Sequence, residues 1–443
     1  RQNKEVTFPM KDKRKKQRIK TENVTYSFDS KRLTYYSGLA PIFKFFDNIG
    51  LIRDINRQFQ TTMVNATKFK TSQLMLTVIS ASLCGISRLS NISIFTSDIL
   101  VKTLLGLPKA INKDVISTRF KALGEAGARR LEELSGQRMR RQIKKLDVNQ
   151  LILDADSTVK TVYGNQGGAQ VGYNPHKRGA KSYHPLLLFL SNTKVVVNSW
   201  LRPGSSYTSN GITEFLKQSS GYLSDSENIF FRADSGFFSG SLFDWLEEQK
   251  WDYLIKVKLK GLKDLLEKQD WTPLAAHQGI WDCEFCHCCK KWVKPRQFKA
   301  VRRIKKYEEK TFFGKTERVP VYEYACYCTN KNLDAWSAHE SYKQRSTSEN
   351  WIDQVKNQLM AGMTLTKDFW ANDILWQLSV LAYNLSVMMR LKNDKYHRQE
   401  HQTFRNWFIC VPAEFWGKSK PKLYLYKYYL FKEQWLNFAD NIL

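Results

Sequence analysis

The chain has 443 residues, and its 70 lysines and arginines against 42 aspartates and glutamates give a formal net charge of +28. Such an excess favours a polyanionic partner such as nucleic acid, which it would bind in a strongly salt-dependent way. The longest apolar stretch, LSVLAYNLSVMM, is shorter than the ~20 residues that span a bilayer, and aromatic and charged residues alternate instead of forming one amphipathic anchor, so composition argues against a membrane protein.

The N-terminal third is predicted to consist of a basic arm followed by helices. Residues 1–35 contain the charge run MKDKRKKQRIK, which indicates a flexible arm. Within residues 36–147, apolar side chains recur at helical spacing, as at Ile42, Phe45 and Ile49 and again at Leu74 and Val78. This segment is therefore predicted to be a helical domain. Its stretch DVISTRFKAL could be a recognition helix, although a packing helix fits the pattern better.

Residues 148–257 show the order of elements that an RNase H-like mixed sheet requires. Buried-type strands are predicted at LILDADSTV, HPLLLFL and KVVVNSWL, and a helix at 213–223 follows. The run IFFRADSGFF predicts another strand, before a helix at 242–248 and a strand at 253–257. The fold class is therefore α/β, with this segment forming the first part of the core.

A β-rich insertion is predicted at residues 258–328, before the second part of the core at 329–393 and a C-terminal region at 394–443. The alternating stretches FKAVRRI, KTFFG and VYEYACYC indicate antiparallel strands. Cys283, Cys286, Cys326 and Cys328 could supply four zinc ligands, but the second pair is more closely spaced than a usual zinc knuckle. Small core residues are the simpler interpretation, so zinc is not expected.

The stretch SYKQRSTSENWIDQVKNQLM holds a group of polar residues that would share one stripe of a helix. At about 100° per residue, Tyr342, Arg345, Glu349 and Lys356 fall within roughly 60° of one another. Apolar side chains occupy an adjacent sector and would pack the helix onto a core: Trp351, Ile352, Val355 and Leu359. A solvated face with an Arg345–Glu349 ion pair is the alternative interpretation.

Three carboxylates could converge if these segments share one core. Asp154 and Asp156 end the first strand and point to the same side of it, while Asp234 follows the end of a later strand. A strand-end aspartate is often only a turn former. Together with Glu349, however, such carboxylates suit two Mg²⁺ or Mn²⁺ ions that clamp an in-line phosphoryl displacement.

These residues resemble a known family. The spacing Tyr342-x2-Arg345-x3-Glu349-x6-Lys356 is similar to the YREK signature of IS4-type DDE transposases. The blocks GAQVGYNPHKRGAKSYHPLL, WLRPGSSYTSNG and FFRADSGFF resemble the IS1380 family of bacterial insertion-sequence transposases. The likeness covers more than half the chain, from about Leu151 to Leu391.

The resemblance implies specific roles for these residues. Asp156, Asp234 and Glu349 would be the catalytic metal ligands, because the family's first aspartate precedes Ser or Thr, as Asp156 does and its competitor Asp154 does not. Residues 36–147 would bind transposon ends and the protein would act as a homodimer on double-stranded DNA in the bacterial cytoplasm. Expected DNA contacts come from the signature, from the basic loop and from one insertion tryptophan: Tyr342, Arg345, Lys356, His176, Lys177, Arg178 and Trp281.

The resemblance also implies a reaction and leaves two alternatives open. Relatives nick DNA at the transposon end, close a hairpin with the freed 3′-hydroxyl and then join the end to target DNA. An insertion-domain tryptophan stacks on a flipped base during hairpin closure. Trp271 and Trp292 compete with Trp281 for that part, and a core ring is the plainer role for Trp281. A metal-dependent nuclease with the same core, or a DNA-binding protein derived from a transposase, remains possible at this point.

Overall fold

The computed structural model describes residues 22, 24–60, 69–175, 177–206, 209, 211–223, 228–312, 315–362, 366–392, 396, 399–417 and 420–442. Its centre is one sheet of nine strands, which in chain order are β2 (Leu151–Ser157), β6 (Leu186–Leu190), β7 (Val195–Trp200), β8 (Ile229–Ala233), β9 (Asp252–Lys256), β10 (Thr272–Pro273), β11 (Ile280–His287), β12 (Arg296–Phe312) and β13 (Lys315–Thr329). Across the sheet they follow the order β10-β11-β12-β13-β9-β8-β2-β6-β7.

Five of these strands form an RNase H-like core with β2 at its centre. β6 pairs antiparallel with β2, and β7 with β6, while β8 and β9 run parallel to β2 on the other side. The runs of Leu, Ile and Phe that predicted these strands are buried on both faces, as continuous apolar strands require. The predicted α/β fold class is thus confirmed.

Helices cover both faces of this core. On one face lie α7 (Ile212–Ser220) and α8 (Gly240–Glu248), where Phe243 of α8 packs on Tyr253 of β9 with ring centroids 4.9 Å apart. The other face is covered by α10 (Ala335–Arg345), α11 (Ser348–Asp353) and α12 (Phe369–Leu391). Ala338 of α10, for example, packs with Phe230 and Leu254.

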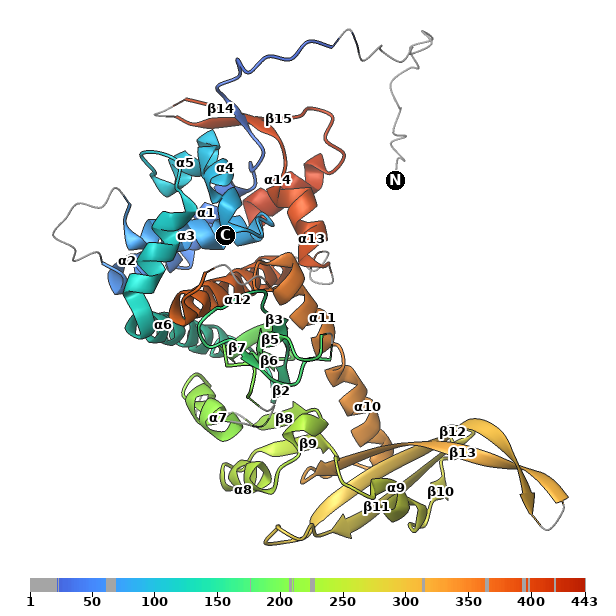
Figure 1. Ribbon diagram of the computed structural model, residues 1–443. Coiled ribbons are helices and arrows are strands. Elements are labelled where there is room, and N and C mark those ends of the chain that lie inside the picture. The colour runs from blue at the N-terminus through green and yellow to red at the C-terminus, as the bar shows by residue number, and fades with distance from the viewer. Residues whose placement is uncertain are drawn as a thin grey trace, which may run out of the picture.

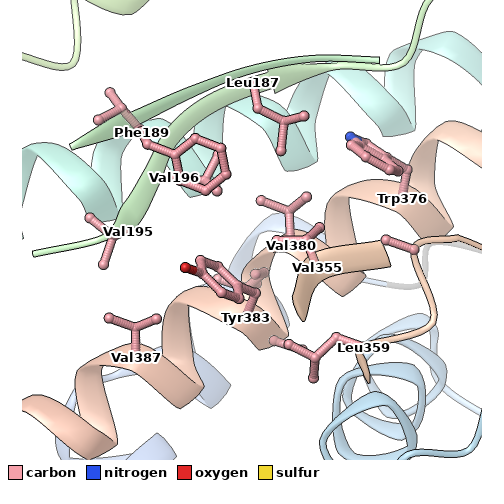
Figure 2. Close-up of a cluster of buried hydrophobic side chains, with 14 of the residues drawn as sticks. Leu187, Phe189, Val195, Val196, Val355, Leu359, Trp376, Val380, Tyr383 and Val387 are labelled. Atoms are coloured by element: carbon pink, nitrogen blue, oxygen red, sulfur yellow. The ribbon is translucent and has the colours of Figure 1, made fainter. Parts of the chain in front are cut away.

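Helix α12 joins the central sheet to the N-terminal helices (Figure 1). Figure 2 shows Trp376, Val380 and Tyr383 of α12 facing Leu187 and Phe189 of β6. With 23 residues, α12 is long and apolar enough to cross a membrane. The stretch LSVLAYNLSVMM, which is only part of this helix, was too short to indicate this. However, 89% of the most apolar window of α12 is buried inside the protein, which is the pattern of a core helix.

The N-terminal segment is helical, as predicted, and the C-terminal segment packs on it. The helices are α1 (Leu39–Asn48), α2 (Leu51–Gln58), α3 (Thr71–Leu83), α4 (Ile92–Ser97), α5 (Ile99–Leu105) and α6 (Lys113–Ile143). The stretch DVISTRFKAL begins α6 and buries Ile116 and Phe120, which fits the packing interpretation.

Contacts between the two ends of the chain make them one structural unit. β1 (Leu33–Thr34) pairs with β14 (Ala413–Trp416), which pairs with β15 (Lys422–Leu425). His401, which begins α13 (His401–Phe404), lies 3.0 Å from the Leu83 carbonyl of α3 through its Nε2 atom. The final helix, α14 (Lys432–Asn441), buries Trp435 and Phe438. The sequence analysis treated residues 36–147 and residues 394–443 as separate regions, so it did not predict that they pack together.

The insertion forms a long antiparallel ribbon, as the alternating pattern predicted. β11, β12 and β13 pair in succession, and the short helix α9 (Leu262–Glu267) precedes them. The last residues of β13, from Tyr327 to Thr329, also pair with β9 of the core. The ribbon is therefore continuous with the central sheet, and Figure 1 shows its far end extending away from the core.

The signature segment is not the single straight helix that the sequence pattern assumed. α10 ends at Arg345, α11 begins at Ser348, and a five-residue π-helix, η4 (Gln354–Gln358), follows. The hydroxyls of Ser346 and Thr347 donate to the last carbonyls of α10, and such bonds compete with helix continuation. The apolar positions of this segment are nevertheless buried, as predicted: Trp351, Ile352, Val355 and Leu359.

Candidate active site

Asp156 and Asp234 stand side by side at the ends of two parallel strands. Ala155 of β2 pairs in register with Ala233 of β8, and each aspartate is the next residue. Neighbouring strands lie about 4.8 Å apart, so the two carboxylates emerge close together. Asp234 also caps the 3₁₀ turn Ser235–Phe237, where its Oδ1 accepts from the Gly236 N–H at 2.8 Å.

The Asp156 carboxylate is buried and held by three donors. Arg345 Nη2 lies 2.9 Å from its Oδ2, Ser348 Oγ donates to the same oxygen at 3.3 Å, and the Ser157 N–H donates to Oδ1 at 2.8 Å. Burial raises the pKa of Asp156 to about 6, and the negative charge of Asp234 adds to this while Arg345 opposes it. The pair thus forms a buried acidic centre that a further cation would stabilise.

Asp154 has a different environment on the same face of β2. Its two oxygens accept from Nε and Nη2 of Arg232 at 2.7 and 2.8 Å, and both side chains are at most 1% exposed. Arg232 also donates to the Ser341 carbonyl of α10 and to Ser191 Oγ. The Asp154 carboxylate is therefore engaged in a buried, bidentate ion pair that ties the sheet to α10.

Glu349 lies beside this centre without joining it. Its side chain is exposed on the first turn of α11, while the preceding residue, Ser348, contacts Asp156. Within the part of the chain that the structure describes, no three His, Cys, Asp or Glu side chains are grouped closely enough to hold a metal ion. Two of the three predicted carboxylates are thus brought together, and the third is on a neighbouring turn.

The other signature residues surround the acidic pair. Lys356 Nζ donates to Thr158 Oγ1 and to the Val159 carbonyl, both at 3.0 Å, just beyond β2. Burial lowers the pKa of Lys356. The Tyr342 ring packs on Tyr327 with centroids 4.8 Å apart. The π-helix, rather than a regular helical stripe, therefore places Lys356 near the strand that bears Asp156.

Lys160 and His184 approach the site. The sequence assigned no role to Lys160 and left phosphate contact or packing open for His184. Lys160 is buried, and burial together with the charge of Lys356 lowers its pKa to about 7. His184 lies between the Ser206 carbonyl at 2.6 Å and Ser157 Oγ at 3.1 Å. Only their proximity to the strand of Asp156 marks them, and that proximity depends on tertiary structure.

The predicted basic loop lies at the surface. Lys177 and Arg178 are exposed, and Lys177 Nζ is 4.9 Å from the centre of the Tyr163 ring. His176 lies outside the described residues. Two cations of the predicted DNA-contacting group are therefore accessible to solvent.

Trp281 is on the opposite face of the sheet from the acidic pair. It shares a face of β11 with Cys283, and its ring packs edge-on against Tyr322 with centroids 5.5 Å apart. Arg302 lies over the rings of Trp281 and Trp271, at 5.4 and 4.7 Å. Asp156, by contrast, faces the side covered by α10.

A tryptophan that the sequence reasoning did not consider lies on the α10 side. Trp336, in the first turn of α10, packs on His277 with ring centroids 4.1 Å apart, and Lys343 Nζ is 5.3 Å from its ring centre. The sequence gives no sign of this placement, because only the fold shows that α10 covers the carboxylate face.

Three of the four candidate zinc-binding cysteines are core residues of the ribbon. Cys283, Cys326 and Cys328 are buried on one face, and burial raises the pKa of the Cys283 thiol to about 12. Cys286 is exposed and lies an odd number of residues from Cys283, so it projects from the other face of β11. The four thiols therefore do not converge on one point.

A pair of carboxylates at adjacent parallel strand ends of an RNase H-like sheet defines a class of metal-dependent phosphoryl-transfer enzymes. The model of the transposase DDE domain group 1 family matches residues 16–433. The chain therefore belongs to this family and is a DNA transposase. Enzymes of this class use divalent ions such as Mg²⁺ or Mn²⁺.

Comparisons with individual proteins give more distant likenesses. None of the curated proteins compared with the sequence matches it. A piggyBac transposase synaptic complex with hairpin DNA is similar over 84% of this chain and 79% of that one, at 14% identity and a TM-score of 0.48. The Mos1 transposase paired-end complex with the left transposon end is similar over 44% of this chain and 60% of that one, at 12% identity and a TM-score of 0.18.

Proposed function

We propose that this transposase is of the IS1380 type, binds the terminal inverted repeats of its element, excises the element and joins it to target DNA. The observation that carries the proposal is the placement of Asp156 beside Asp234, with α11 and its Glu349 directly adjacent. The YREK-like residues Tyr342, Arg345 and Lys356 surround the same point, which supports a site for a DNA phosphate.

Asp156, Asp234 and Glu349 would hold two divalent ions. Carboxylate oxygens are the ligands that Mg²⁺ prefers, and a bound cation would offset the burial that raises the pKa of Asp156. Glu349 would complete the set by a local adjustment of α11, whose first residue already contacts Asp156. Bound ions would supply charge compensation at the scissile phosphate and lower the pKa of the attacking water.

Arg345 and Lys356 would position the DNA. The Nε–H of Arg345 is buried and has no hydrogen-bond partner within the described residues, so a phosphate oxygen would reach it only after a local rearrangement. Lys356 is fixed by the Thr158 and Val159 oxygens and lies on the same side of β2. Tyr342 packs beneath Arg345, whose guanidinium carbon is 5.9 Å from the ring centre.

The reaction would proceed by nicking, attack of the freed 3′-hydroxyl and hairpin closure, within a homodimer on DNA. Hairpin closure requires a sharply bent strand, and an aromatic ring that stacks on an extruded base contributes about 1–3 kcal/mol. Trp281 is the proposed ring of the insertion. Trp336 is its competitor, because it lies on the face of the sheet that bears Asp156.

The test is metal-dependent cleavage of a labelled transposon-end duplex. Asp156→Asn, Asp234→Asn and Glu349→Gln should each abolish nicking while end binding persists, because each removes an anionic ligand without changing its size. Asp353→Asn is the matched control, since Asp353 is an exposed carboxylate of the same helix as Glu349. Full nicking by the Asp156→Asn variant in Mg²⁺ would refute the assignment.

A second assay separates a transposase from a nuclease. The wild-type protein should join precut ends to a supercoiled target, and a nuclease of the same fold would not. Failure to join ends, with nicking intact, would leave only the nuclease activity.

A further inference from the structure

A basic groove lies where three helices end, away from the acidic pair. Its cavity has a volume of about 550 Å³. It is formed by the C-terminal ends of α1, α6 and α12, and the residues lining it are Asn48, Ile49, Arg138, Arg141, Gln142, Lys144, Lys145 and Lys392. Five of these eight side chains are cationic, and none is acidic.

Part of this charge has a structural role. Arg138 and Arg141 both contact the buried carboxylate of Asp54, at 2.7 and 3.0 Å. Lys144 and Lys145, in contrast, are exposed, and neither forms an ion pair with an acidic side chain in the described part of the chain. The five cations less the one carboxylate leave a formal charge of +4.

Capping of helix ends does not account for so much charge. A helix C-terminus carries about half a negative charge, so three of them offset roughly 1.5 of the four positive charges. A residual charge of about +2.5 therefore remains in one concave surface. Surplus cations held together without acidic partners are unfavourable for folding, and a bound polyanion would relieve their repulsion.

A second, separate cavity lies between the end of α12 and the turn that leads into α11. This cavity of about 270 Å³ begins at Leu391, the residue before Lys392. Its charged lining residues are Lys194, Arg390 and the acidic Glu400. It also reaches Thr347 and Asn350, which lie on either side of Glu349 in the sequence. The end of α12 thus borders both cavities, which places the basic groove on the same part of the molecule as the entry to α11.

We propose that the groove binds the sugar–phosphate backbone of the duplex next to the cleaved end, with Lys144 and Lys145 as the main phosphate contacts. The inference rests on the proposed transposase function and adds a second contact surface to it. Backbone contacts of this kind carry no sequence information, so they act equally on transposon-end and unrelated duplexes. The groove thus contributes sequence-independent affinity for DNA, and other residues recognise the terminal repeat.

The experiment measures the salt dependence of DNA binding by fluorescence anisotropy. The probes are a labelled duplex that carries the element's terminal repeat and a second duplex of shuffled sequence. Lys144→Ala/Lys145→Ala should reduce the slope of log Kobs against log salt by about 1.8, which corresponds to 0.9 for each lost phosphate contact. Affinity at low salt should fall roughly tenfold or more for both probes.

The matched control is Lys113→Ala/Lys121→Ala, which removes the same charge from exposed positions near the other end of α6. The nearest lysines of the two pairs, Lys121 and Lys144, are 23 positions apart in the sequence (144 − 121), and a kink in α6 at Gly124 lies between them. An unchanged slope for the groove variant, or equal losses for both variants, would overturn the proposal. Because both lysines are exposed, the variant should keep the wild-type circular dichroism spectrum.

Protection from chemical modification tests the same contact in the wild-type protein. Bound duplex should reduce acetylation of Lys144 and Lys145, read by mass spectrometry, and leave Lys113 and Lys121 unchanged. Equal acetylation with and without bound DNA would also overturn the proposal. A wild-type protein that binds neither duplex would instead refute the proposed function itself, so the two failures are distinguishable.

Discussion

Replacing Asp154 and Asp156 by asparagine should have opposite effects on stability and catalysis, although the two residues share one face of β2. Asp154 is fully buried in a bidentate pair with Arg232, and Asp156 lies beside the like charge of Asp234. Asp154→Asn leaves the Arg232 guanidinium buried without a counter-charge. Removing one partner of such a pair costs about 3–5 kcal/mol.

Asp156→Asn removes a carboxylate whose ionised form is unfavourable in the fold. The pKa of Asp156 is raised from 3.8 to about 6, so stability is lost as pH rises through this window and is lowest above pH 6. The shift corresponds to about 3 kcal/mol, of which Asn should recover a part because it can still accept a hydrogen bond from Arg345. Stability at pH 8 without metal should therefore be equal to or above that of the wild type.

Urea unfolding at pH 8, followed by circular dichroism, measures both effects. A double-mutant cycle with Arg232→Gln provides the control, because the double variant should lose little more than either single variant when the two residues are paired. Equal stability of the two asparagine variants would refute the reasoning. So would loss of nicking in a folded Asp154→Asn protein that binds DNA normally.

Three further predictions concern other parts of the molecule. Burial raises the pKa of Asp373 to about 7, so this group should make the wild type lose stability as pH rises from about 4 to 7; Asp373→Asn should remove this contribution, leaving that of Asp156, and gain about 2 kcal/mol at pH 8 in the same unfolding assay. Replacing Arg345 or Lys356 by Ala should weaken the end complex and reduce its salt slope by about 1, and an unaltered slope would mean that these cations do not reach phosphate. Trp281→Ala should spare nicking and reduce hairpin yield on a prenicked end; if it lowers soluble yield and both activities together while Trp336→Ala lowers hairpin yield alone, the stacking role belongs to Trp336.

Local patterns were sufficient to predict the core strands and the packing face of the signature segment. The run from Leu151 to Leu153 and the run from Ile229 to Phe231 are apolar, short and followed by turn-forming residues, which leaves few alternatives to a buried strand. Trp351, Val355 and Leu359 were likewise predicted to be buried, because their spacing places them in one sector. Such predictions hold because the spacing of apolar side chains is local, and it determines which face of an element must be buried.

Features that depend on contacts between distant segments could not be predicted in this way. The π-helix at Gln354–Gln358 changes the phase of the signature after Glu349, so a regular helical wheel misplaces Lys356. Trp281 lies in the predicted insertion and Trp336 follows it, and nothing in the sequence shows that they lie on opposite sides of the sheet. The association of β14 with β1 joins residues almost four hundred positions apart, and no local pattern records it.

The different environments of Asp154 and Asp156 follow from a single alignment of two short segments. In the parallel pairing of β2 with β8, Asp154 lies opposite Arg232, and the next position on the same face sets Asp156 beside Asp234. An opposite charge at the first position produces a buried ion pair, whereas at the second position burial, reinforced by the like charge of Asp234, raises the pKa of Asp156 and creates a place for a cation. The segments LILDADS and IFFRADS supply the residues for both environments. Which aspartate meets which partner can be deduced only when the pairing register of the two strands is known. The parallel register, rather than either segment alone, therefore separates the structural carboxylate from the catalytic one.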